Sequence, residues 1–540
     1  MKKTIKIIPT IICMTLMTGA CTDLDETVYS DVTEANFDYG TNIGTAMGMV
    51  YKDLKVIADY TKNFSLQEAS TDAIVMPANA SGWYNGGEYN RAHHHTWTSM
   101  EPQLEAFWNE FVSGVVKCNT ALDLLNSGRL EASKEDIEYA KYEVRAVRAF
   151  YYWYLTDLFG DFPLVTATAE QALPEKTPRA DICSWIEGEL IEIIPHLTEE
   201  SGINQYGRMN QWAARTLLAT LYLNWEVYTG TPRWEDCITQ CDEVINSRKY
   251  DLEANYKDAF KAYGMETSPE IIFTIPYDNA THSWGNRLHC ASWHSLCQKV
   301  FSLTDGPYGE GCIAAVPQFI DTYDEDDTRL EDTWLMGKMY LPDGSPALIE
   351  TGANKGKQLE FKKEMKDGDL VEEGEGYRMW KFEVAKGSYA QSDTDYPLFR
   401  YADILMMKAE AMLRLGRPGA GALVTQVRQR AFRDTDPSKA TVTDEQLAEN
   451  SCYRYGYVEN YRIVDDGDQT PVKFGRMYDE LGWEFVWECH RRRDAIRFGV
   501  YTTKSWLSHK PNGDYRIVFP LPEKKLAANP NLKQNPDYVD

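Results

Sequence analysis

A glycine-rich stretch in the first fifth of the chain carries aromatic rings beside polar side chains. Residues 82–91 read Gly-Trp-Tyr-Asn-Gly-Gly-Glu-Tyr-Asn-Arg. An exposed ring presents a flat apolar face, and amide and guanidinium groups beside it can bind surrounding hydroxyl groups, which favours a neutral, hydroxyl-rich ligand. Glycines leave no helix face on which two neighbouring rings could be buried, so we expect at least one ring to face solvent. The candidate ligand-binding residues here are Trp83, Tyr84, Asn85 and Arg91.

A second stretch of similar composition lies far downstream. Residues 282–286 read His-Ser-Trp-Gly-Asn, and a further tryptophan follows at position 293. The candidate ligand-binding residues here are Trp284, Asn286 and Trp293. The alternative is that each ring packs a loop onto the core. This alternative stays open for Trp83 and Trp284 and is the preferred interpretation for Trp293 and Tyr308.

Two clusters have metal-binding residue types without the required spacing. His93, His94 and His95 are consecutive, so their side chains point apart, and no cysteine or acid completes a tetrahedral set. Residues 321–329 are rich in aspartate but lack the glycine and the terminal glutamate of an EF-hand loop. We predict no metal and no other cofactor, although the sequence alone leaves calcium at residues 321–329 open. One disulfide among Cys290, Cys297 and Cys312 is also left open.

Known catalytic motifs are missing from the sequence. It contains no phosphate-binding Gly-x-x-x-x-Gly-Lys, no Gly-x-Ser-x-Gly elbow and no His-Glu-x-x-His. Carboxylates are so numerous that a glycosidase pair can be neither chosen nor excluded. A binding role is therefore favoured over catalysis. The basic run Arg491–Arg493 beside Glu484 and Glu488 predicts ion pairs along a helix and not a phosphate site.

The first 20 residues have the composition of a secretory signal. Three lysines precede an apolar stretch at residues 7–17, which is shorter than the roughly 20 residues that span a bilayer. Small residues then precede Cys21, as in a bacterial lipobox, although Thr18 stands where an aliphatic residue is usual. We predict lipidation at Cys21 and, from the acidic residues 23–26, export to the cell surface. The alternative is an ordinary signal with a chance cysteine.

The composition of the remaining chain is that of a folded, acidic protein. Aromatic residues make up 12% of the chain and prolines number only 23, which argues against disorder. The net charge of −26 becomes about −29 when the three lysines of residues 1–20 are removed. This charge opposes binding to nucleic acid.

Apolar residues recur at three- and four-residue spacing through much of the chain. The segments predicted to be helical are Leu104–Asn126, Glu135–Phe159, Asp181–Leu197, Asn210–Tyr228, Trp234–Asn246, Leu398–Leu415, Ala420–Phe432 and Tyr478–Phe498. The tryptophans at helical spacing, predicted to lie in the core, are Trp108, Trp153, Trp212 and Trp487. Small residues at 213, 214 and 219 allow close packing of a tetratricopeptide-like hairpin, and such hairpins must stack to bury their apolar faces.

The residue composition changes between about residues 264 and 396. Glycines, aspartates and short β-branched runs predict isolated strands and long loops, and long loops tend to carry function. We therefore predict a mostly α fold in one domain, residues 21–540. Its helical scaffold covers about 40–260 and 397–500, and its irregular part covers about 264–396.

Several sequence motifs occur in an order that resembles one known family. Residues 143–165 form a run of arginines and tyrosines that ends in Gly-Asp-Phe-Pro-Leu-Val, and residues 484–494 read Glu-x-x-x-Glu-x-x-Arg-x-x-Asp. Further matching stretches are 207–208, 268–273, 400–411 and 519–536. Together they resemble the SusD/RagB family of Bacteroidetes outer-membrane nutrient-binding lipoproteins.

The resemblance implies a helical fold with four tetratricopeptide-like units and binding loops in the two aromatic stretches. It also implies capture of oligosaccharides and partnership with a SusC-like TonB-dependent transporter. We therefore expect a non-enzymatic, lipid-anchored outer-membrane protein that faces the cell exterior and delivers oligosaccharides to that transporter. The alternatives are a RagB-like peptide-binding subunit, a structural lid subunit without binding of its own, and a hydrolytic surface lipoprotein.

Overall fold

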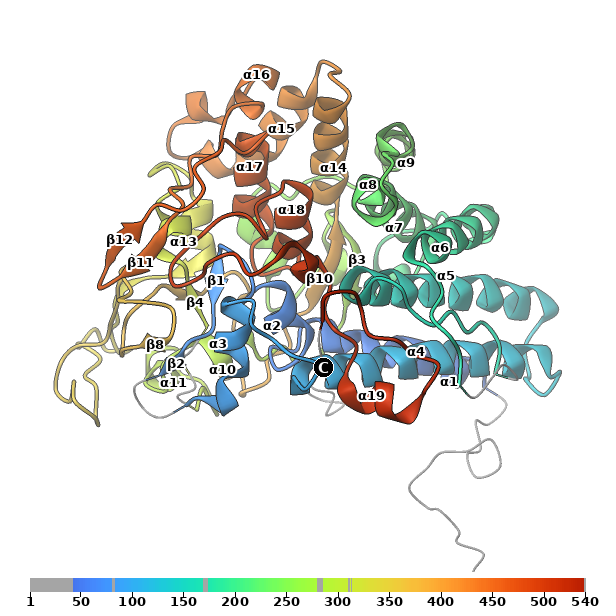
Figure 1. Cartoon of the computed structure of the whole chain (residues 1–540), viewed down its shortest axis with the longest axis horizontal. Coiled ribbons are helices and arrows are strands. Elements are labelled where there is room, and N and C mark those ends of the chain that lie inside the picture. Colours follow the sequence, from blue (N-terminus) through green and yellow to red (C-terminus); the bar gives the residue numbers. More distant parts are fainter. Residues whose placement is uncertain are drawn as a thin grey trace, which may run out of the picture. The chain divides into compact units, whose positions relative to one another are not determined.

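The computed structural model describes residues 42–79, 83–168, 173–278, 285–308, 311 and 313–538. The α-helices are α1 (Ile43–Tyr51), α2 (Asn63–Gln67), α3 (Glu88–His93), α4 (Pro102–Asn126), α5 (Lys134–Phe159), α6 (Arg179–Ile193), α7 (Gln211–Leu223), α8 (Trp225–Thr229), α9 (Trp234–Ser247), α10 (Leu288–Ser292), α11 (Cys297–Val300), α12 (Pro317–Ile320), α13 (Arg329–Thr333), α14 (Tyr401–Arg414), α15 (Ala420–Phe432), α16 (Asp444–Leu447), α17 (Gly475–Phe485), α18 (Arg491–Arg497) and α19 (Glu523–Ala528). The strands are β1 (Ile74–Val75), β2 (Ala78–Asn79), β3 (Ile271–Ile275), β4 (Ala314–Ala315), β5 (Trp334–Leu335), β6 (Gly337–Lys338), β7 (Glu360–Phe361), β8 (Leu370–Val371), β9 (Arg378–Met379), β10 (Tyr396–Arg400), β11 (Tyr457–Glu459) and β12 (Arg462–Asp465). In this part of the chain, the long helices α4, α5, α6, α7 and α9 lie on one side of the view, and the short strands β1, β2, β4, β8, β11 and β12 lie on the other (Figure 1). None of the described helices is both long and apolar enough to cross a membrane.

The helices α4 and α5 form a closely packed pair (Figure 1). Pro102 opens α4, where its missing N–H is not needed, and the Ser133 hydroxyl caps α5 by accepting a hydrogen bond from the amide of Asp136. A Cβ atom at Gly114 of α4 would lie 2.3 Å from the ring of Tyr151 in α5. Glycine at this position therefore lets the two helices approach.

The remaining long helices continue the stack. Helix α5 packs on α6, α6 on α7, α7 on α9, α9 on α14, and α14 on α15. The helical blocks on either side of residues 264–396 are therefore joined through α9 and α14. The four tryptophans predicted to lie in the core are all buried. The predicted mostly α fold with few short strands is confirmed.

The predicted single helix over Tyr478–Phe498 is wrong. Helix α17 ends at Phe485 and α18 begins at Arg491. Between them, Trp487 and Cys489 have φ values of 76° and 62°, which an α-helix does not allow. The predicted helix Asn210–Tyr228 is likewise divided into α7 and α8, and the start of Leu398–Leu415 belongs to strand β10.

The short strands bring distant segments together. All described strands pair in twos. Strand β3 pairs antiparallel with β10, with Ile275 opposite Tyr396, and so joins the two ends of the irregular part. Strand β2 pairs parallel with β8, with Asn79 opposite Val371. The second pairing places the start of the first aromatic stretch against a segment almost 300 residues away.

A group of buried ion pairs surrounds α17. Glu484 Oε1 lies 2.6 Å from Nη2 of Arg430 and 3.1 Å from Nη1 of Arg400, and Arg400 Nη1 lies 2.5 Å from Glu270 Oε1. Burial alone would raise the pKa of Glu484, but the surrounding arginines lower it to about 2. Each charge of this group therefore has an opposite charge beside it, as the low polarity of the core requires.

The basic run Arg491–Arg493 makes ion pairs across the structure and not along its own helix, contrary to the prediction. Arg491 Nε lies 2.7 Å from Asp72 Oδ1, and Arg492 Nη1 lies 3.1 Å from Asp157 Oδ2. These pairs attach α18 to the first third of the chain.

Candidate functional site

Asn79, at the end of β2, fixes the backbone of Trp83. The Asn79 amide donates to the Trp83 carbonyl at 2.9 Å, and the Trp83 amide donates to Asn79 Oδ1 at 3.0 Å. The indole ring stacks on Tyr89, with centroids 5.2 Å apart and planes inclined by 6°. Because the buried Tyr89 covers one face of the half-buried indole, at most the opposite face is available to a ligand.

Tyr84 is the exposed ring of this stretch. The side chain is 56% exposed, which confirms that at least one ring of the stretch faces solvent. Its phenol lies against Gly87, where a Cβ atom would be 2.3 Å from the Tyr84 hydroxyl oxygen and where φ is 76°. Glycine at position 87 is needed for both reasons. The Tyr84 ring thus packs against the backbone at Gly87, while more than half of the side chain is exposed to solvent.

Asn85 and Arg91 are held by protein partners. Asn85 Nδ2 donates to the carboxylate of Glu88. Arg91 binds both carboxylate oxygens of Glu101, at 2.7 and 2.6 Å, and also donates to the carbonyl of Gly86 at 2.9 Å. Burial and the nearby carboxylate of Glu101 raise the pKa of Glu88 to about 7. Arg91 therefore fastens the aromatic stretch to the start of α4, and its role as a ligand contact stays a prediction.

A cavity of about 210 Å³, which we refer to as the loop cavity, is connected to this stretch through Asn79, which lines the cavity and bonds to the Trp83 backbone. The pairing of β2 with β8 builds it, because Asn79 then lies next to Val371 and the residues that follow. Tyr308, which is 61% exposed, adds an aromatic ring. The lining residues are Asn79, His294, Ser295, Tyr308, Gly311, Thr351, Phe361, Val371, Glu372, Glu373, Gly374 and Arg378.

The walls of the loop cavity are polar. His294 Nε2 lies 3.9 Å from Glu373 Oε1, and burial lowers the pKa of His294, so the imidazole is largely neutral at pH 7. The Arg378 guanidinium lies over the ring of Phe361, 5.5 Å from its centroid. Amide, carboxylate and imidazole groups thus surround a space with an exposed tyrosine at its edge. Such a space can hold hydroxyl groups while the ring covers an apolar face of the ligand.

The second aromatic stretch contributes less than expected. Asn286 is 2% exposed, and its Oδ1 accepts a hydrogen bond from the Leu288 amide at 3.1 Å. Trp293 is completely buried, and its Nε1 donates to the Met379 carbonyl at 2.5 Å. The packing interpretation is therefore confirmed for Trp293, and neither side chain offers a surface to a ligand in this structure. The predicted signal, Cys21, Trp284 and Cys312 lie outside the described residues.

Tyr308 is the cavity residue that the sequence interpretation misplaced. Packing onto the core was its preferred interpretation, but its exposure shows that it is not a core residue. Its hydroxyl donates to the carboxylate of Asp305, which lies on the same loop. Glycines at 306 and 309 flank this tyrosine, as glycines flank the rings of the Trp83 stretch, and this is a signal that could have identified it. No comparable pattern marks His294, Glu373 or Arg378.

In the described part of the chain, no cluster of three or more His, Cys, Asp or Glu side chains is arranged to hold a metal ion. In the acidic stretch 321–329, the carboxylates of Asp324 and Asp326 contact Lys439 Nζ at 2.7 and 2.6 Å. A lysine thus occupies the place where a calcium ion could have been expected. Cys297 is a buried free thiol.

Comparisons with known proteins agree with this architecture. The SusD family model matches residues 269–538, and a model described as starch-binding associating with outer membrane matches residues 24–223. The starch-binding protein SusD of Bacteroides thetaiotaomicron is 26% identical over 523 residues, which cover 89% of this chain and 86% of that protein.

Solved structures share the fold. A SusD superfamily protein from Parabacteroides distasonis superposes with a TM-score of 0.68 at 20% identity, covering 92% of this chain and 98% of that one. A laminarin-binding SusD-like protein superposes with a TM-score of 0.65 at 20% identity, covering 92% and 100%. With one family model matching half of the chain and the same fold in solved members, this chain belongs to the SusD family.

Proposed function

We propose that this protein is a cell-surface glycan-binding protein that captures oligosaccharides by stacking sugar faces on exposed rings. The observation that carries the proposal is the polar loop cavity, with the exposed Tyr308 at its edge and the exposed Tyr84 on the adjoining stretch. Sugars present C–H faces ringed by hydroxyl groups, which match rings beside hydrogen-bonding groups. The names of the starch-binding and laminarin-binding relatives support a glycan ligand.

The proposal extends to the cellular setting. We propose a lipid anchor at Cys21, a position at the outer membrane facing the exterior, and delivery of the glycan to a SusC-like TonB-dependent transporter. The sequence motifs and the outer-membrane association in the description of the amino-terminal family model support this setting. Binding and delivery, and not catalysis, is the proposed activity.

Ring-removal variants test the glycan site. In the chain lacking residues 1–21, we expect Tyr84→Ala and Tyr308→Ala each to weaken binding of maltohexaose or laminarihexaose about two- to tenfold. One stacked ring contributes about 0.5–1.5 kcal/mol. Isothermal titration calorimetry measures the change. The matched control is Tyr263→Ala, which removes a ring that is 67% exposed and does not line the loop cavity.

Two results would contradict the proposal. One is equal weakening in the Tyr263 control, which would show a general effect of losing a surface ring. The other is no binding across a broad glycan array. Binding of peptides by the same protein would then favour the RagB-like alternative.

A further inference from the structure

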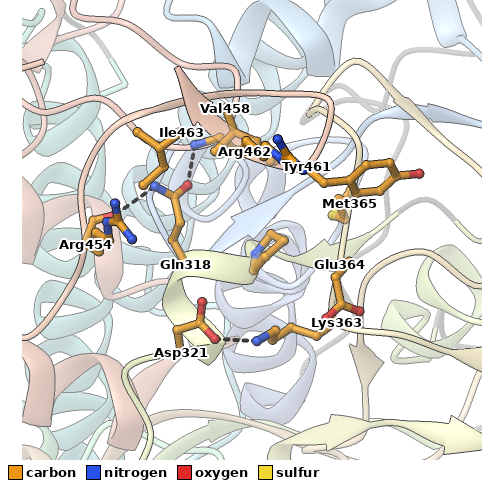
Figure 2. Close-up of a pocket in the computed structure, with 12 residues that line it drawn as sticks. Gln318, Asp321, Lys363, Glu364, Met365, Arg454, Val458, Tyr461, Arg462 and Ile463 are labelled. Carbon is orange, nitrogen blue, oxygen red and sulfur yellow. Dashed lines mark hydrogen bonds and ion pairs between the residues drawn. The ribbon is translucent and has the colours of Figure 1, made fainter. Parts of the chain in front are cut away.

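A second polar cavity, of about 450 Å³, lies under the β11–β12 hairpin, and we refer to it as the hairpin cavity. Helix α12 and residues 363–365 form its other walls (Figure 2). One segment separates it from the loop cavity, since Phe361 and Gly374 line the loop cavity whereas residues 363–365 line the hairpin cavity. The two cavities share no lining residue among those described.

Tyr461 occupies the turn of this hairpin in a conformation that favours glycine. Asn460 and Tyr461, the two turn residues, have φ values of 47° and 67°. Two-residue hairpin turns of this kind usually carry Asn-Gly, and a tyrosine in the second position is strained. Its side chain is nevertheless 56% exposed, and its hydroxyl donates to Glu375 Oε1 at 2.6 Å. Burial of the ring therefore does not offset the backbone strain. Contact of the exposed ring with a ligand would explain why tyrosine stands at this position.

Two arginines of the hairpin cavity have no ion-pair or hydrogen-bond partner for their guanidinium groups within the described residues. They are Arg454 and Arg462. Figure 2 shows Arg462 on the hairpin and Arg454 apart from it, beside Gln318. The neighbouring Lys363 differs, because its Nζ lies 2.5 Å from Asp321 Oδ1. Once this pair is set aside, the lining holds two guanidinium groups and the single carboxylate of Glu364.

The floor of the cavity is rigidly held. Gln318 Nε2 donates to the carbonyls of Arg454 and Gly456 at 2.9 and 3.0 Å, and Gln318 Oε1 accepts from the Leu507 amide at 2.6 Å. The amide is thereby committed to the backbone of two separate segments. It fixes the backbone at Arg454 relative to α12, so a ligand would meet a preformed wall.

We propose that the hairpin cavity is a second saccharide site, for a glycan unit that carries a carboxylate or sulfate group. Tyr461 supplies a ring for the sugar face, and Arg454 and Arg462 supply guanidinium forks that match the geometry of a carboxylate or sulfate. Glu364 offers an acceptor for sugar hydroxyl groups. Glu375, which accepts from the Tyr461 hydroxyl, lies outside the lining of the cavity, so among the described residues the two guanidinium groups are the unpaired cations that an anionic group would meet inside it. The site goes beyond the glycan capture proposed for the loop cavity and does not depend on it.

Calorimetry with three probes tests the proposal in the chain lacking residues 1–21. Hexagalacturonate carries carboxylates, a κ-carrageenan hexasaccharide carries sulfates, and maltohexaose is neutral. We expect the Arg454→Ala/Arg462→Ala variant to bind whichever charged probe the protein takes at least tenfold more weakly and to bind maltohexaose unchanged. The matched control is Arg129→Ala/Arg248→Ala, which removes the same charge from exposed positions on other elements and is expected to leave all three affinities unchanged.

The variant Tyr461→Gly separates a binding role from a structural one. Glycine relieves the positive φ, so we expect the unfolding temperature not to fall while binding of the charged probe is lost. Tyr461→Phe keeps the ring and is expected to keep binding.

Three outcomes would overturn the proposal: neither charged probe binds the unaltered chain, the double arginine variant binds them as tightly as the control, or Tyr308→Ala alone abolishes their binding. The last result would place the charged glycan in the loop cavity and leave the proposed function intact. Loss of maltohexaose binding in Tyr308→Ala with charged-probe binding retained would support two separate sites.

Discussion

At the scale of single residues, His95 shows how burial controls protonation in this fold. Its ring is completely buried, with the rings of Tyr501 and His509 at centroid distances of 4.3 and 4.2 Å. Its Nε2 lies 2.8 Å from the Ser70 carbonyl oxygen and therefore carries the proton of the neutral ring. Burial lowers the pKa of His95 to about 3. In the unfolded chain the same histidine titrates at about 6.5.

The stability of the protein is therefore expected to fall as the pH drops below about 6.5. Between about 6.5 and 3 the unfolded state binds a proton at His95 that the folded state does not bind, so the folded state loses about 1.4 kcal/mol per pH unit at this site. The variant His95→Gln keeps a donor for Ser70 and removes the titration. We expect the slope of unfolding free energy against pH, measured by urea denaturation between pH 6.5 and 4.5, to decrease by about that amount.

The control is His196→Gln, which changes an exposed histidine. It is expected to leave the slope unchanged. If His95→Gln has the same slope as the unaltered chain, protonation of His95 does not limit acid stability and this account is wrong.

At the scale of elements, the break between α17 and α18 is stabilised by a lysine from outside both helices. Lys381 Nζ donates to the carbonyls of Glu484 and Val486 at 2.8 and 2.9 Å and to Glu488 Oε1 at 2.5 Å. These carbonyls are left without helical partners where α17 ends. The buried ammonium group satisfies them together with one carboxylate.

Replacing this lysine is expected to destabilise the break strongly. Lys381→Met keeps the apolar stem but removes the donor of the Val486 carbonyl. It also removes one donor from the Glu484 carbonyl and one from the Glu488 carboxylate, which Tyr256 and Arg400 still contact. Leaving a buried acceptor without its donor costs about 1–3 kcal/mol, and we expect a loss of this size in the free energy of unfolding by urea denaturation. Lys386→Met, at an exposed position of the same segment, is expected to change it by less than about 0.5 kcal/mol. A loss in Lys381→Met no larger than in this control would show that the break does not need the lysine.

At the scale of the whole molecule, residues 41–540 form one compact unit, and the predicted lipid attachment residue, Cys21, precedes it. An acylated cysteine would anchor the unit because each buried CH₂ group contributes about 0.8 kcal/mol to membrane binding. If the Cys21 thiol is removed, the protein is therefore expected to leave the membrane. The folded unit itself should not change.

We expect Cys21→Ala to move the protein from the outer-membrane fraction to the soluble fraction. Cell fractionation with immunodetection measures this, and protease treatment of intact cells reports whether the unaltered protein faces the exterior. Circular dichroism of the variant should match that of the unaltered protein. Retention of Cys21→Ala in the membrane fraction would contradict anchoring through this residue.

The sequence by itself determined most helices, the family and one exposed aromatic stretch. Apolar spacing is a local property, so segments such as Ala420–Phe432 could be recognised without knowing their partners. The effect of the glycines around Trp83 and Tyr84 is also local, because a glycine-rich stretch forms no helix face on which both rings could be buried. The order of the motifs identified the family, because short motifs can be recognised even where the overall sequence identity to a relative is only 26%.

Only the tertiary structure decided which rings can meet a ligand and where α17 ends. Trp293 and Tyr308 both lie in irregular segments, yet one is fully buried and the other is mostly exposed. Their exposure depends on distant segments, as with Trp293, whose ring donates to the carbonyl of Met379. Just after the end of α17, the Val486 carbonyl likewise accepts a hydrogen bond from Lys381, more than 100 residues earlier. The loop cavity exists because β2 pairs with β8, and a pairing of two residues on each side is too short to leave a pattern in the sequence.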